Sequence, residues 1–503
     1  MHDPRVHIFR LAAAAYPTTT PFSPSMAYPE YPFPGEIGTQ ENHAYEGVRQ
    51  LLRGLGYDAK RFNTPAWNPL CHLVKPGNTV VIKPNFVLSR HPEGKDLFSI
   101  ITHPSVIRAI ADYCWIALNG AGRIIIADAP QYNCNFDELL EATHLNKVCD
   151  LYRKFPGPQV DIRDLRNYWS ASLHMPSCIR RLAGDPWGNV RVDLGKGSVF
   201  VSHPHPERFY GAVYHRQETI INHTNDLQQY EISGTVLGAD VLISVPKLKV
   251  HKKVGVTLNG KGLVGTCTNK NLLVHYCLGA PKDGGDQFPD GLLTRKEETI
   301  IRFERWMYDT FLSRRSVGCE YIHRFVYGFL YLKILRHLGL NIPKEKRLLD
   351  TGNWYGNDSA WRMVVDLMTI LHHTDAQGEL CTYLAPRRTF SIIDGIVGGE
   401  NKGPLAPDPK HSGVLIAGEH LLAVDIVGTR LMGFNPLKLK QITAFVGRKA
   451  LLGLNSVSDI PVTSNDPAFA NCLSDPGNSF LAFKPYPGWR GHIEISNNHG
   501  GPA

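Results

Sequence analysis

The densest group of residues that could do chemistry is the stretch Val245–Gly265, VPKLKVHKKVGVTLNGKGLVG, which holds five lysines, one histidine and four glycines. Lys247, Lys249 and His251 alternate along the chain, so in an extended conformation their side chains point the same way. Crowded ammonium groups repel one another, which depresses lysine pKa values and destabilises the fold unless an anion binds. Glycines such as Gly255 let the backbone approach a ligand closely. The stretch predicts a site for a small anionic molecule, and its place directly after a buried strand favours this over a solvated basic loop.

A second group begins at His275 and continues through HYCLGAPKDGGDQFPD, where Asp283, Asp286 and Asp290 fall among glycines. A histidine and carboxylates can bind a divalent metal or share a proton. The spacing matches no metal motif, and aspartates in such a segment also cap turns. Both interpretations stay open on the sequence.

Polar residues also gather at the start of a predicted helix in GNWYGNDSAWRMVVD. Asn357, Asp358 and Arg362 would converge there, where a helix favours an anion. Asp358 or Ser359 would be the N-cap, and Arg362 and Asp366 lie one turn apart on the same face. The alternative is an ordinary cap with an ion pair.

The glycine-rich run DGIVGGENKGP follows another buried-strand pattern. It resembles a loop that cradles a ligand, although it is neither a GxGxxG fingerprint nor a P-loop. Its binding candidates are Asp394, Gly399, Glu400 and Gly403. Asp425 lies within an apolar helix pattern, where a carboxylate must be paired, functional or neutral. The candidate metal ligands of the whole chain are His251, His275, Asp286 and Asp425.

Smaller candidates stand where predicted strands end or a helix begins. Lys83 and Asn85 lie in KPNFV, His103 lies in THPS, and Asp128 lies in ADAP. Each could contact a cofactor, and each could equally cap a helix or form a turn.

The elements that must position these residues follow an α/β order. Short apolar runs typical of buried strands occupy residues 78–84, 122–130, 239–246, 390–396 and 413–418. Helical patterns occupy residues 44–55, 103–118 and 421–432. Strand, helix and strand in this order predict a right-handed parallel unit.

We therefore expect an α/β protein of two α/β lobes with mainly parallel sheets, a β-rich elaboration around residues 150–235 and a basic helical insertion. The expected division is an irregular N-terminal arm over 1–45, a first lobe with the lysine-rich stretch over 46–290, the insertion over 291–350, and a second lobe with a C-terminal tail over 351–503. The two lobes would close over a cleft.

The composition is that of an ordinary globular protein, with 503 residues, 43% of them hydrophobic and 20% charged. None of the ten cysteines forms a CxxC pair, which argues against an iron–sulfur cluster and a secreted disulfide scaffold. Neither a secretory signal nor a membrane-spanning run is recognisable, so we expect a cytoplasmic protein. A homo-oligomer stays open.

Most of the net charge of +8 is local, because residues 295–347 hold twelve Lys or Arg against six Asp or Glu, a net of +6. Within them, residues 321–340, YIHRFVYGFLYLKILRHLGL, form a basic amphipathic pattern. Its spacing favours a helix packed on the protein's own core, with peripheral contact to an anionic membrane as the alternative. No recognition motif accompanies the charge, so nucleic acid is not an expected partner.

Several of these motifs, in order, resemble the family called domain of unknown function 362. They are IKPNFV, THPSVIRAI, ADAP, GADVLISVPKLKVHKKVGVTLNGKGLVG, GNWYGNDSAWRMVVDL and the stretch from IIDGIVGGENKGP to LLAVDIVGTRLMGF, across roughly residues 75–440. The resemblance implies no settled activity. Many relatives carry ferredoxin-type cysteines, which this chain lacks, and the usual K-N-L-x-G after the lysine-rich loop is here Lys261-Gly262-Leu263-Val264-Gly265.

The family is in turn distantly similar to the nickel-pincer lactate racemases. Their cofactor motif has a His, a Gly four residues later and a Lys ten residues after the His, and His251, Gly255 and Lys261 have that spacing. The similarity implies that Lys261 attaches the cofactor or contacts its phosphate, and that His251 is an acid/base group. The implied cofactor is a nickel-pincer-type nucleotide, with a simple divalent metal as the alternative.

Three functions remain as hypotheses. The leading one is an enzyme that moves a proton, or a hydride by way of a cofactor, on a small anionic substrate, as racemases, epimerases or oxidoreductases do. His251, Lys261 and His275 are its expected catalytic residues. The second is Mg²⁺-dependent phosphoryl or nucleotidyl transfer. The third is a non-catalytic accessory or binding protein of a biosynthetic pathway.

Overall fold

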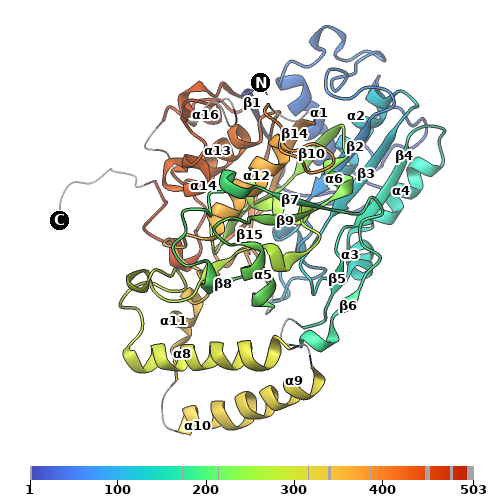
Figure 1. Ribbon diagram of the computed structural model, residues 1–503. Coiled ribbons are helices and arrows are strands. Elements are labelled where there is room, and N and C mark those ends of the chain that lie inside the picture. Colours follow the sequence, from blue (N-terminus) through green and yellow to red (C-terminus); the bar gives the residue numbers. More distant parts are fainter. Residues whose placement is uncertain are drawn as a thin grey trace.

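The computed structural model describes residues 3–172, 175–212, 215–314, 316–337, 341–383, 387–447, 452, 454–475, 478 and 480–495. Within them, ten strands form one central sheet (Figure 1). Its main path runs through β16 (Val462–Ser464), β1 (Val6–Arg10), β15 (Asp408–Gly418), β14 (Arg388–Glu400), β10 (Val241–Val245), β2 (Thr79–Pro84), β3 (Arg123–Asp128) and β4 (Gln159–Asp164). The strand β11 (Lys247–His251) pairs with β14 and with the short β12 (Gly255–Val256).

Most neighbouring strands of this sheet are parallel, which confirms the predicted α/β class. The pairs β4–β3, β3–β2, β2–β10 and β10–β14 are all parallel, whereas β15 runs antiparallel to both β14 and β1. The helix α2 (Pro104–Leu118) connects β2 to β3, as its sequence pattern predicts. Because β10 hydrogen-bonds to β14, strands from both predicted lobes belong to the same sheet.

Apolar residues alternate along the strands and supply two cores, one on each face of the sheet. In β3, Ile124 and Ile126 belong to one core and Ile125 to the other. The first core is covered by α1 (His43–Gly54), α2, α3 (Phe136–Thr143) and α4 (Leu145–Arg153), and the second by α6 (Gly234–Leu237), α12 (Ala360–His373) and α13 (Leu421–Leu431). Burial on both faces explains why these strands read as continuous apolar runs.

Short antiparallel pairs make up the predicted β-rich elaboration. They are β5 (Tyr168–Trp169) with β6 (Arg180–Arg181), β7 (Asn189–Asp193) with β9 (Gln229–Ser233), and β8 (Phe209–Tyr210) with β13 (Tyr276–Cys277). The remaining short helices include α5 (Arg216–Asn222), α7 (Leu258–Gly262), α14 (Lys440–Thr443) and α16 (Pro467–Ala470).

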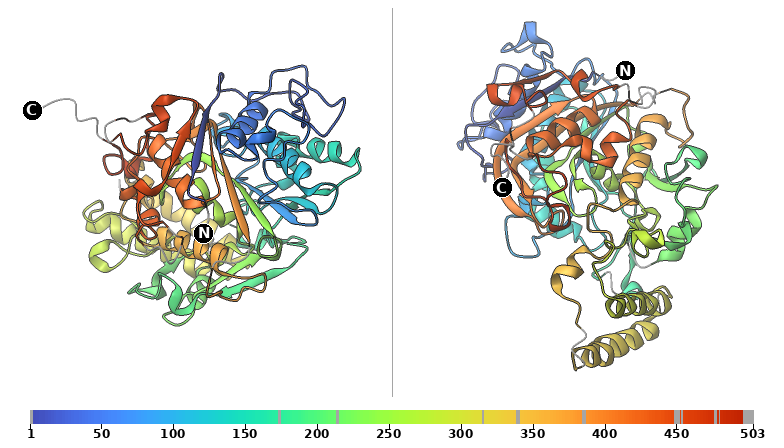
Figure 2. Two further views of the ribbon diagram at one scale, coloured as in Figure 1. Left: turned by 90° about the horizontal axis from the view of Figure 1, so that it is seen from above. Right: turned by 90° about the vertical axis from the view of Figure 1, so that its left-hand side faces the viewer.

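The basic insertion is helical and projects from the body of the molecule as a pair of helices (Figures 1 and 2). The first is α8 (Arg295–Met307), extended by a π-helical turn, η9 (Tyr308–Leu312). The second consists of α9 (Val317–His323), the π-helical η10 (Arg324–Tyr331) and α10 (Leu332–His337), after which α11 (Lys344–Leu349) returns to the body. No helix in the described parts of the chain combines the length and the hydropathy needed to cross a bilayer.

The N-terminal arm does not simply lie over the surface, because several of its side chains are buried. Beyond β1 it has no regular element before α1, but Phe22, Tyr28 and Phe33 are buried in the core beside α1 and α2. Tyr16 reaches the sheet itself and donates a hydrogen bond to Asp394 at 2.6 Å. The aromatic side chains of the arm therefore anchor it to the fold.

Candidate functional site

A cavity of about 390 Å³ opens where the parallel strands of the sheet end. Asn85 follows the last residue of β2, Asp128 is the last residue of β3, and Lys249 lies in β11, directly after β10. This edge is where open α/β sheets bind their ligands. The volume is within the range of small-molecule sites.

The wall of this cavity is rich in positive charge. Its described lining includes five lysines and one arginine, namely Lys249, Lys252, Lys253, Lys261, Lys270 and Arg305. Asp128 is the one carboxylate among those lining residues. Its Oδ1 accepts a hydrogen bond from Lys83 Nζ at 2.8 Å, and its Oδ2 accepts one from the Phe86 backbone N–H at 2.8 Å. Because Asp128 is already paired, it cannot neutralise the lysines.

The lysines differ in how they are held. Lys249 Nζ donates to the carbonyl oxygen of Ile100, Lys253 Nζ to that of Thr351, and Lys270 Nζ to that of Val264. Lys261 Nζ forms neither a hydrogen bond nor an ion pair with any residue in the described ranges, although Lys261 is only 8% exposed. The amine of Lys261 is therefore available to a ligand in the cavity.

Burial and mutual repulsion lower the pKa values of these amines. Burial, followed by the neighbouring Lys270, lowers the pKa of Lys261 to about 7. Burial also lowers the pKa of Lys270 to about 8. The pKa values of Lys249 and Lys253 lie well below the ordinary lysine value, again because of burial first and neighbouring lysines second. An anion in the cavity would reverse these shifts, since it favours the charged amine.

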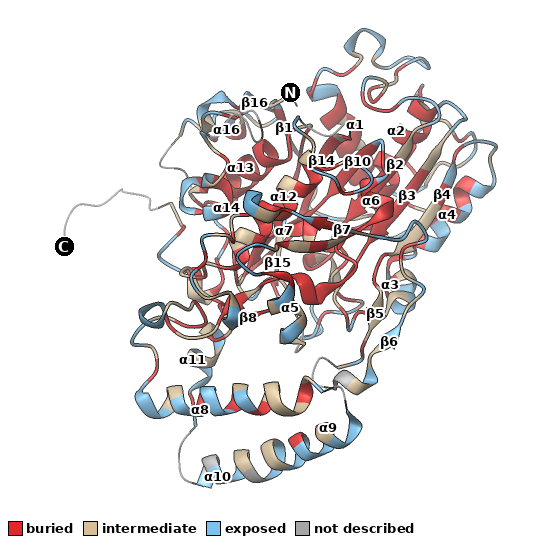
Figure 3. Cartoon of the chain, in the orientation of Figure 1, coloured by how far each residue is buried: buried red, intermediate tan, exposed pale blue. Residues whose placement is uncertain are grey.

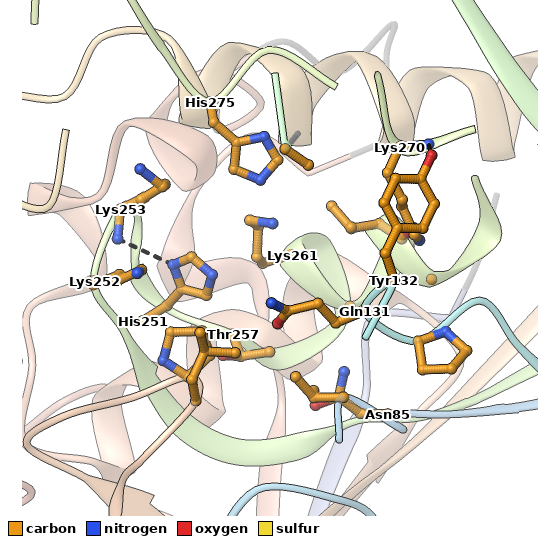
Figure 4. A pocket seen from close by; sticks show the side chains of 18 of the residues that line it. Asn85, Gln131, Tyr132, His251, Lys252, Lys253, Thr257, Lys261, Lys270 and His275 are labelled. Carbon is orange, nitrogen blue, oxygen red and sulfur yellow. Dashed lines mark hydrogen bonds between the residues drawn. The ribbon is translucent and has the colours of Figure 1, made fainter. Parts of the chain in front are cut away.

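Two histidines face the same space from opposite sides of Lys261 (Figure 4). The Nδ1 of His251 accepts a hydrogen bond from the Lys253 backbone N–H at 3.1 Å, so its neutral ring carries the proton on Nε2. The Nδ1 of His275 lies 2.8 Å from the Leu273 carbonyl oxygen and must donate to it, which leaves a lone pair on Nε2. Burial, with nearby lysines, holds both pKa values well below the usual histidine range. The cavity thus holds one neutral donor ring and one neutral acceptor ring.

Other polar atoms at the cavity also lack a partner. Asn85 Oδ1, Thr257 Oγ1 and Arg305 Nε are buried and bond to nothing in the part of the chain that the structure describes. These three atoms have almost no accessible surface, and several further buried side-chain atoms of residues outside the lining are also unpaired in the described ranges, so this observation does not by itself indicate a ligand.

Six of the residues singled out from the sequence line this cavity. They are Asn85, Asp128, Lys249, His251, Lys261 and His275. The sequence-based reasoning missed Thr257, Lys270 and Arg305. Lys270 follows Lys261 by nine positions in the sequence, and this proximity was a usable signal. Nothing in the pattern of the basic helix marks Arg305 among its other arginines.

Lys247 and Asp394 lie next to the cavity lining rather than in it. Lys247 Nζ donates to Asp394 Oδ2 at 2.9 Å and to the Tyr16 hydroxyl at 2.7 Å, and both side chains of the ion pair are fully buried. The backbone N–H of His103 also donates to Asp394, and the His103 ring stacks on Tyr16. His103 in addition caps α2. This cluster attaches the N-terminal arm to the strands that carry the site.

The glycine-rich run after Asp394 continues β14 to Glu400 instead of forming a loop. A Cβ at Gly399 would lie 2.5 Å from the Ser99 carbonyl oxygen, and one at Gly403 would overlap the Val250 carbonyl oxygen. Gly399 therefore lets β14 approach the backbone of Ser99, and Gly403 lets the following turn approach β11 closely. Glu400 Oε2 accepts a hydrogen bond from the Lys484 backbone N–H at 3.0 Å.

Gly255 allows the tight return from β11 to β12. Its φ is +81°, in the region that side chains disfavour, and its residue pair across the strands is His251. A Cβ there would also lie 2.8 Å from a methyl group of Leu439. Gly255 thus shapes the strand that presents His251.

The polar residues at the start of α12 cap that helix away from the cavity. Asn357 Oδ1 accepts from the backbone N–H groups of Ser359 and Ala360, and Asp286 Oδ2 accepts from those of Asp358 and Ser359. Ser359 is the N-cap residue, as predicted, but its side chain makes no capping hydrogen bond.

Arg362 and Asp366, which were predicted to pair within α12, each bond to other residues. Arg362 pairs with Asp358 at 2.8 Å. Asp366 accepts instead from the Ser198 and Tyr230 hydroxyls, and its burial raises its pKa to about 6. Asp366 therefore fixes the β-rich elaboration to α12.

Asp425 is fully engaged by the protein. It accepts from the Asn259 backbone and side-chain N–H groups and from the Gly260 backbone N–H, all at 2.8 Å. Burial raises its pKa to about 7. Asp425 thereby holds α7, whose Lys261 reaches the cavity. Across the described ranges, no three His, Cys, Asp or Glu side chains come together as metal ligands.

Because Gly265 has no side chain, the Lys83–Asp128 ion pair can occupy the space beside it. We expect Gly265→Ala to lower the free energy of unfolding by about 3–5 kcal/mol, the loss typical of breaking a buried ion pair. The added Cβ would overlap Asp128 Oδ1 and lie 2.6 Å from Lys83 Nζ. Urea unfolding measures the change. Gly197→Ala is the matched control, because no atom lies within 4 Å of its added Cβ. Equal stability of the two variants would contradict this role of Gly265.

One family model matches more than half of the chain. It is described as "Domain of unknown function (DUF362)" and covers residues 80–172 and 200–430, which include every described residue of the cavity wall from Lys249 to Arg305. No curated protein and no solved structure matches the chain.

Proposed function

The chain belongs to the DUF362 family, and because that description assigns no activity, we propose from the cavity alone that the protein is an enzyme that moves a proton on a small anionic substrate. One observation carries the proposal. Five lysine amines and two neutral histidines face one cavity of about 390 Å³, and the single carboxylate of its described lining is already paired. Such a wall suits a negatively charged molecule whose reactive atom lies between the two rings.

The two histidines would have different roles. The lone pair on His275 Nε2 would take a proton from the substrate, for instance from the carbon next to a carboxylate. The negative charge that develops on the substrate oxygen would be met by the Nε2–H of His251 and by the surrounding ammonium groups. Lys261, whose ammonium form the bound anion favours, would return a proton to the same atom. Return on the other face of that atom would give racemisation or epimerisation.

If a hydride leaves instead of a proton, a bound cofactor must accept it, because no side chain can. The residues present fit a phosphate-bearing cofactor on charge, and Lys261 offers an unpartnered amine that is partly neutral near pH 7. Such a group would supply the hydride acceptor. The native mass of freshly purified protein would reveal it as an added mass, and peptide mapping would place that mass at Lys261.

The test of the proposed function is exchange of substrate protons with solvent. The protein would be incubated in D₂O with a set of small 2-hydroxy carboxylates and phosphate esters that carry a C–H next to the acid group, and proton NMR would follow loss of that signal. We expect exchange for at least one member of the set. Tight binding of such an anion with neither exchange nor inversion of its configuration, in protein purified with any cofactor intact, would overturn the enzyme proposal and leave a binding protein.

Anion affinity is expected to fall as the pH rises from about 7 to 9. In the ligand-free protein the pKa values are about 7 for Lys261 and about 8 for Lys270, so both amines lose their protons in this interval. A bound anion favours the protonated amines, so binding takes up protons and weakens by up to about 10-fold per pH unit for each lysine. Calorimetric titration with sulfate, which does not itself titrate here, measures the effect. Affinity that is constant or rises with pH would contradict the assignment of these lysines to the anion.

A further inference from the structure

The projecting pair of helices carries an exposed apolar surface, here called the hairpin face. It consists of Phe303 and Trp306 on α8 and of Tyr321, Ile322, Phe325, Phe329 and Ile334 on the second helix. Exposed fractions range from 38% for Phe303 to 65% for Tyr321. Large apolar side chains exposed together on one projecting element of a protein mark an interaction site.

The second helix is apolar on two opposite sides. On one side, the rings of His323 and Tyr327 pack at a tilt against Tyr308, and Tyr331 contacts Phe303, so this side packs on the first helix. The other side belongs to the hairpin face, where Phe325 and Phe329 stack on each other with ring centroids 5.8 Å apart. Figure 3 shows that much of this helix is exposed and that it faces away from the body. The packing explains one apolar side and leaves the other without a partner in the described structure.

Basic and acidic residues of the two helices differ in their exposure to solvent. Among the described residues of 295–337, every charged residue classed as exposed is basic, namely Arg295, Lys296, Arg302, Arg314, Arg324 and Lys333. The acidic residues are turned inward. Glu304 pairs with Arg347, Asp309 with Arg216, and Glu320 accepts from Ser177. The outer surface of the helix pair is therefore both apolar and uniformly positive.

We propose that the hairpin face docks the protein on the surface of an anionic lipid bilayer, with the helix pair lying in the headgroup region. Aromatic side chains would enter the boundary between headgroups and acyl chains, while the arginines and lysines would meet lipid phosphates and carboxylates. Lys333 Nζ lies 5.4 Å from the centre of the Phe329 ring, so apolar and basic groups already stand side by side on this surface.

The charge pattern favours a lipid surface over a second copy of the chain. A twofold contact through the hairpin face would bring the same basic residues of both copies together, and like charges oppose such a contact. A bilayer that contains acidic lipids offers the complementary charge over the whole face. The helices also need no further length, because a helix that lies in the interface does not cross it.

Flotation with lipid vesicles tests the proposal. The full-length protein is expected to float with vesicles that contain phosphatidylserine and to stay behind with vesicles of phosphatidylcholine alone, and added salt should weaken the binding. The double variant Phe325→Ser/Phe329→Ser should lose binding. Arg324→Glu and Lys333→Glu should each weaken partitioning about five-fold or more, since one basic residue near the surface contributes about that factor.

Matched controls lie elsewhere on the surface. Leu437→Ser removes a side chain of an exposed residue outside the hairpin face, and Lys60→Glu reverses an exposed charge. Both should float like the wild type. Sulfate binding in the cavity should stay unchanged in all variants, which shows that they fold and separates this proposal from the enzymatic one.

Two results would overturn the proposal. One is a wild-type protein that stays unbound to phosphatidylserine vesicles at low salt. The other is self-association in analytical ultracentrifugation that the Phe325→Ser/Phe329→Ser variant abolishes while its vesicle binding equals that of the wild type. The second result would assign the hairpin face to contact between copies of the chain.

Discussion

Lys261→Met is expected to make the ligand-free protein more stable at pH 7 and to remove most of its anion binding. The pKa of Lys261 in the fold is about 7, against an ordinary value of 10.5, because burial disfavours its charge. At about 1.4 kcal/mol per pKa unit, this shift destabilises the ligand-free fold by on the order of 4 kcal/mol near pH 7. Methionine has a similar shape and no charge to bury. Urea unfolding with and without sulfate measures both effects.

The size of this gain in stability depends on pH. Lysine in the unfolded chain takes up its proton as the pH falls through about 10.5, whereas Lys261 in the fold takes up its proton only near 7, so stability is lost across that interval as the pH falls. The gain from Lys261→Met should therefore be greatest at pH 7 and vanish near pH 10.5. Unfolding curves at the two pH values separate this electrostatic effect from a change in packing.

Lys83→Met is the matched control, and its expected change in the free energy of unfolding has the opposite sign. Lys83 is 2% exposed and pairs with the equally buried Asp128 at 2.8 Å. Lys83→Met leaves that carboxylate without its cation, and we expect a loss of about 3–5 kcal/mol in the free energy of unfolding. If Lys261→Met were as destabilising as Lys83→Met and sulfate still bound, Lys261 would belong to the scaffold and not to the anion site.

His275→Asn is expected to slow proton exchange by about 10²- to 10⁴-fold, the usual contribution of a positioned base. An asparagine amide can still donate to the Leu273 carbonyl oxygen in place of Nδ1. It offers no lone pair where Nε2 stood. The NMR exchange rate should therefore collapse, while sulfate affinity stays within a few-fold of the wild type.

His251→Asn removes a donor instead of a base. The asparagine oxygen can still accept from the Lys253 backbone N–H, as Nδ1 does, but the Nε2–H that faces the cavity is lost. Loss of one such donor to a developing negative charge lowers turnover by about 10²- to 10³-fold. Exchange that survives at the wild-type rate in both histidine variants would remove these two rings from the chemistry.

The sequence predicted the elements of the fold better than the orientation of individual side chains. Continuous apolar runs such as residues 122–130 and 239–246 can hardly be anything but buried strands once helices flank them, and both are strands of the sheet. Alternation also predicted that Lys247, Lys249 and His251 point the same way. The pairing of β11 with β14 shifts register between Lys247 and Lys249, and Lys247 pairs with Asp394 instead of lining the cavity.

The rest of the site depends on contacts between residues far apart in the sequence. Tyr16 meets Asp394 across most of the chain, and Arg305 reaches the cavity from an insertion whose docking no local pattern reveals. Histidine tautomers likewise follow from single backbone bonds to Lys253 and Leu273, which depend on how the loop closes. Hydrophobic periodicity predicts which face of a helix or strand is buried, but it contains no information about contacts between residues far apart in the sequence.

The place of β1 in the sheet has a consequence for how the protein is made. Val6–Arg10 lies between β15 (Asp408–Gly418) and β16 (Val462–Ser464), so both of its partners are synthesised near the other end of the chain. At about 5–20 residues per second, a ribosome needs on the order of half a minute or more to supply them. Until then the apolar edge of this strand stands open to other nascent chains, and chaperones that hold unfinished polypeptides would have to shield it.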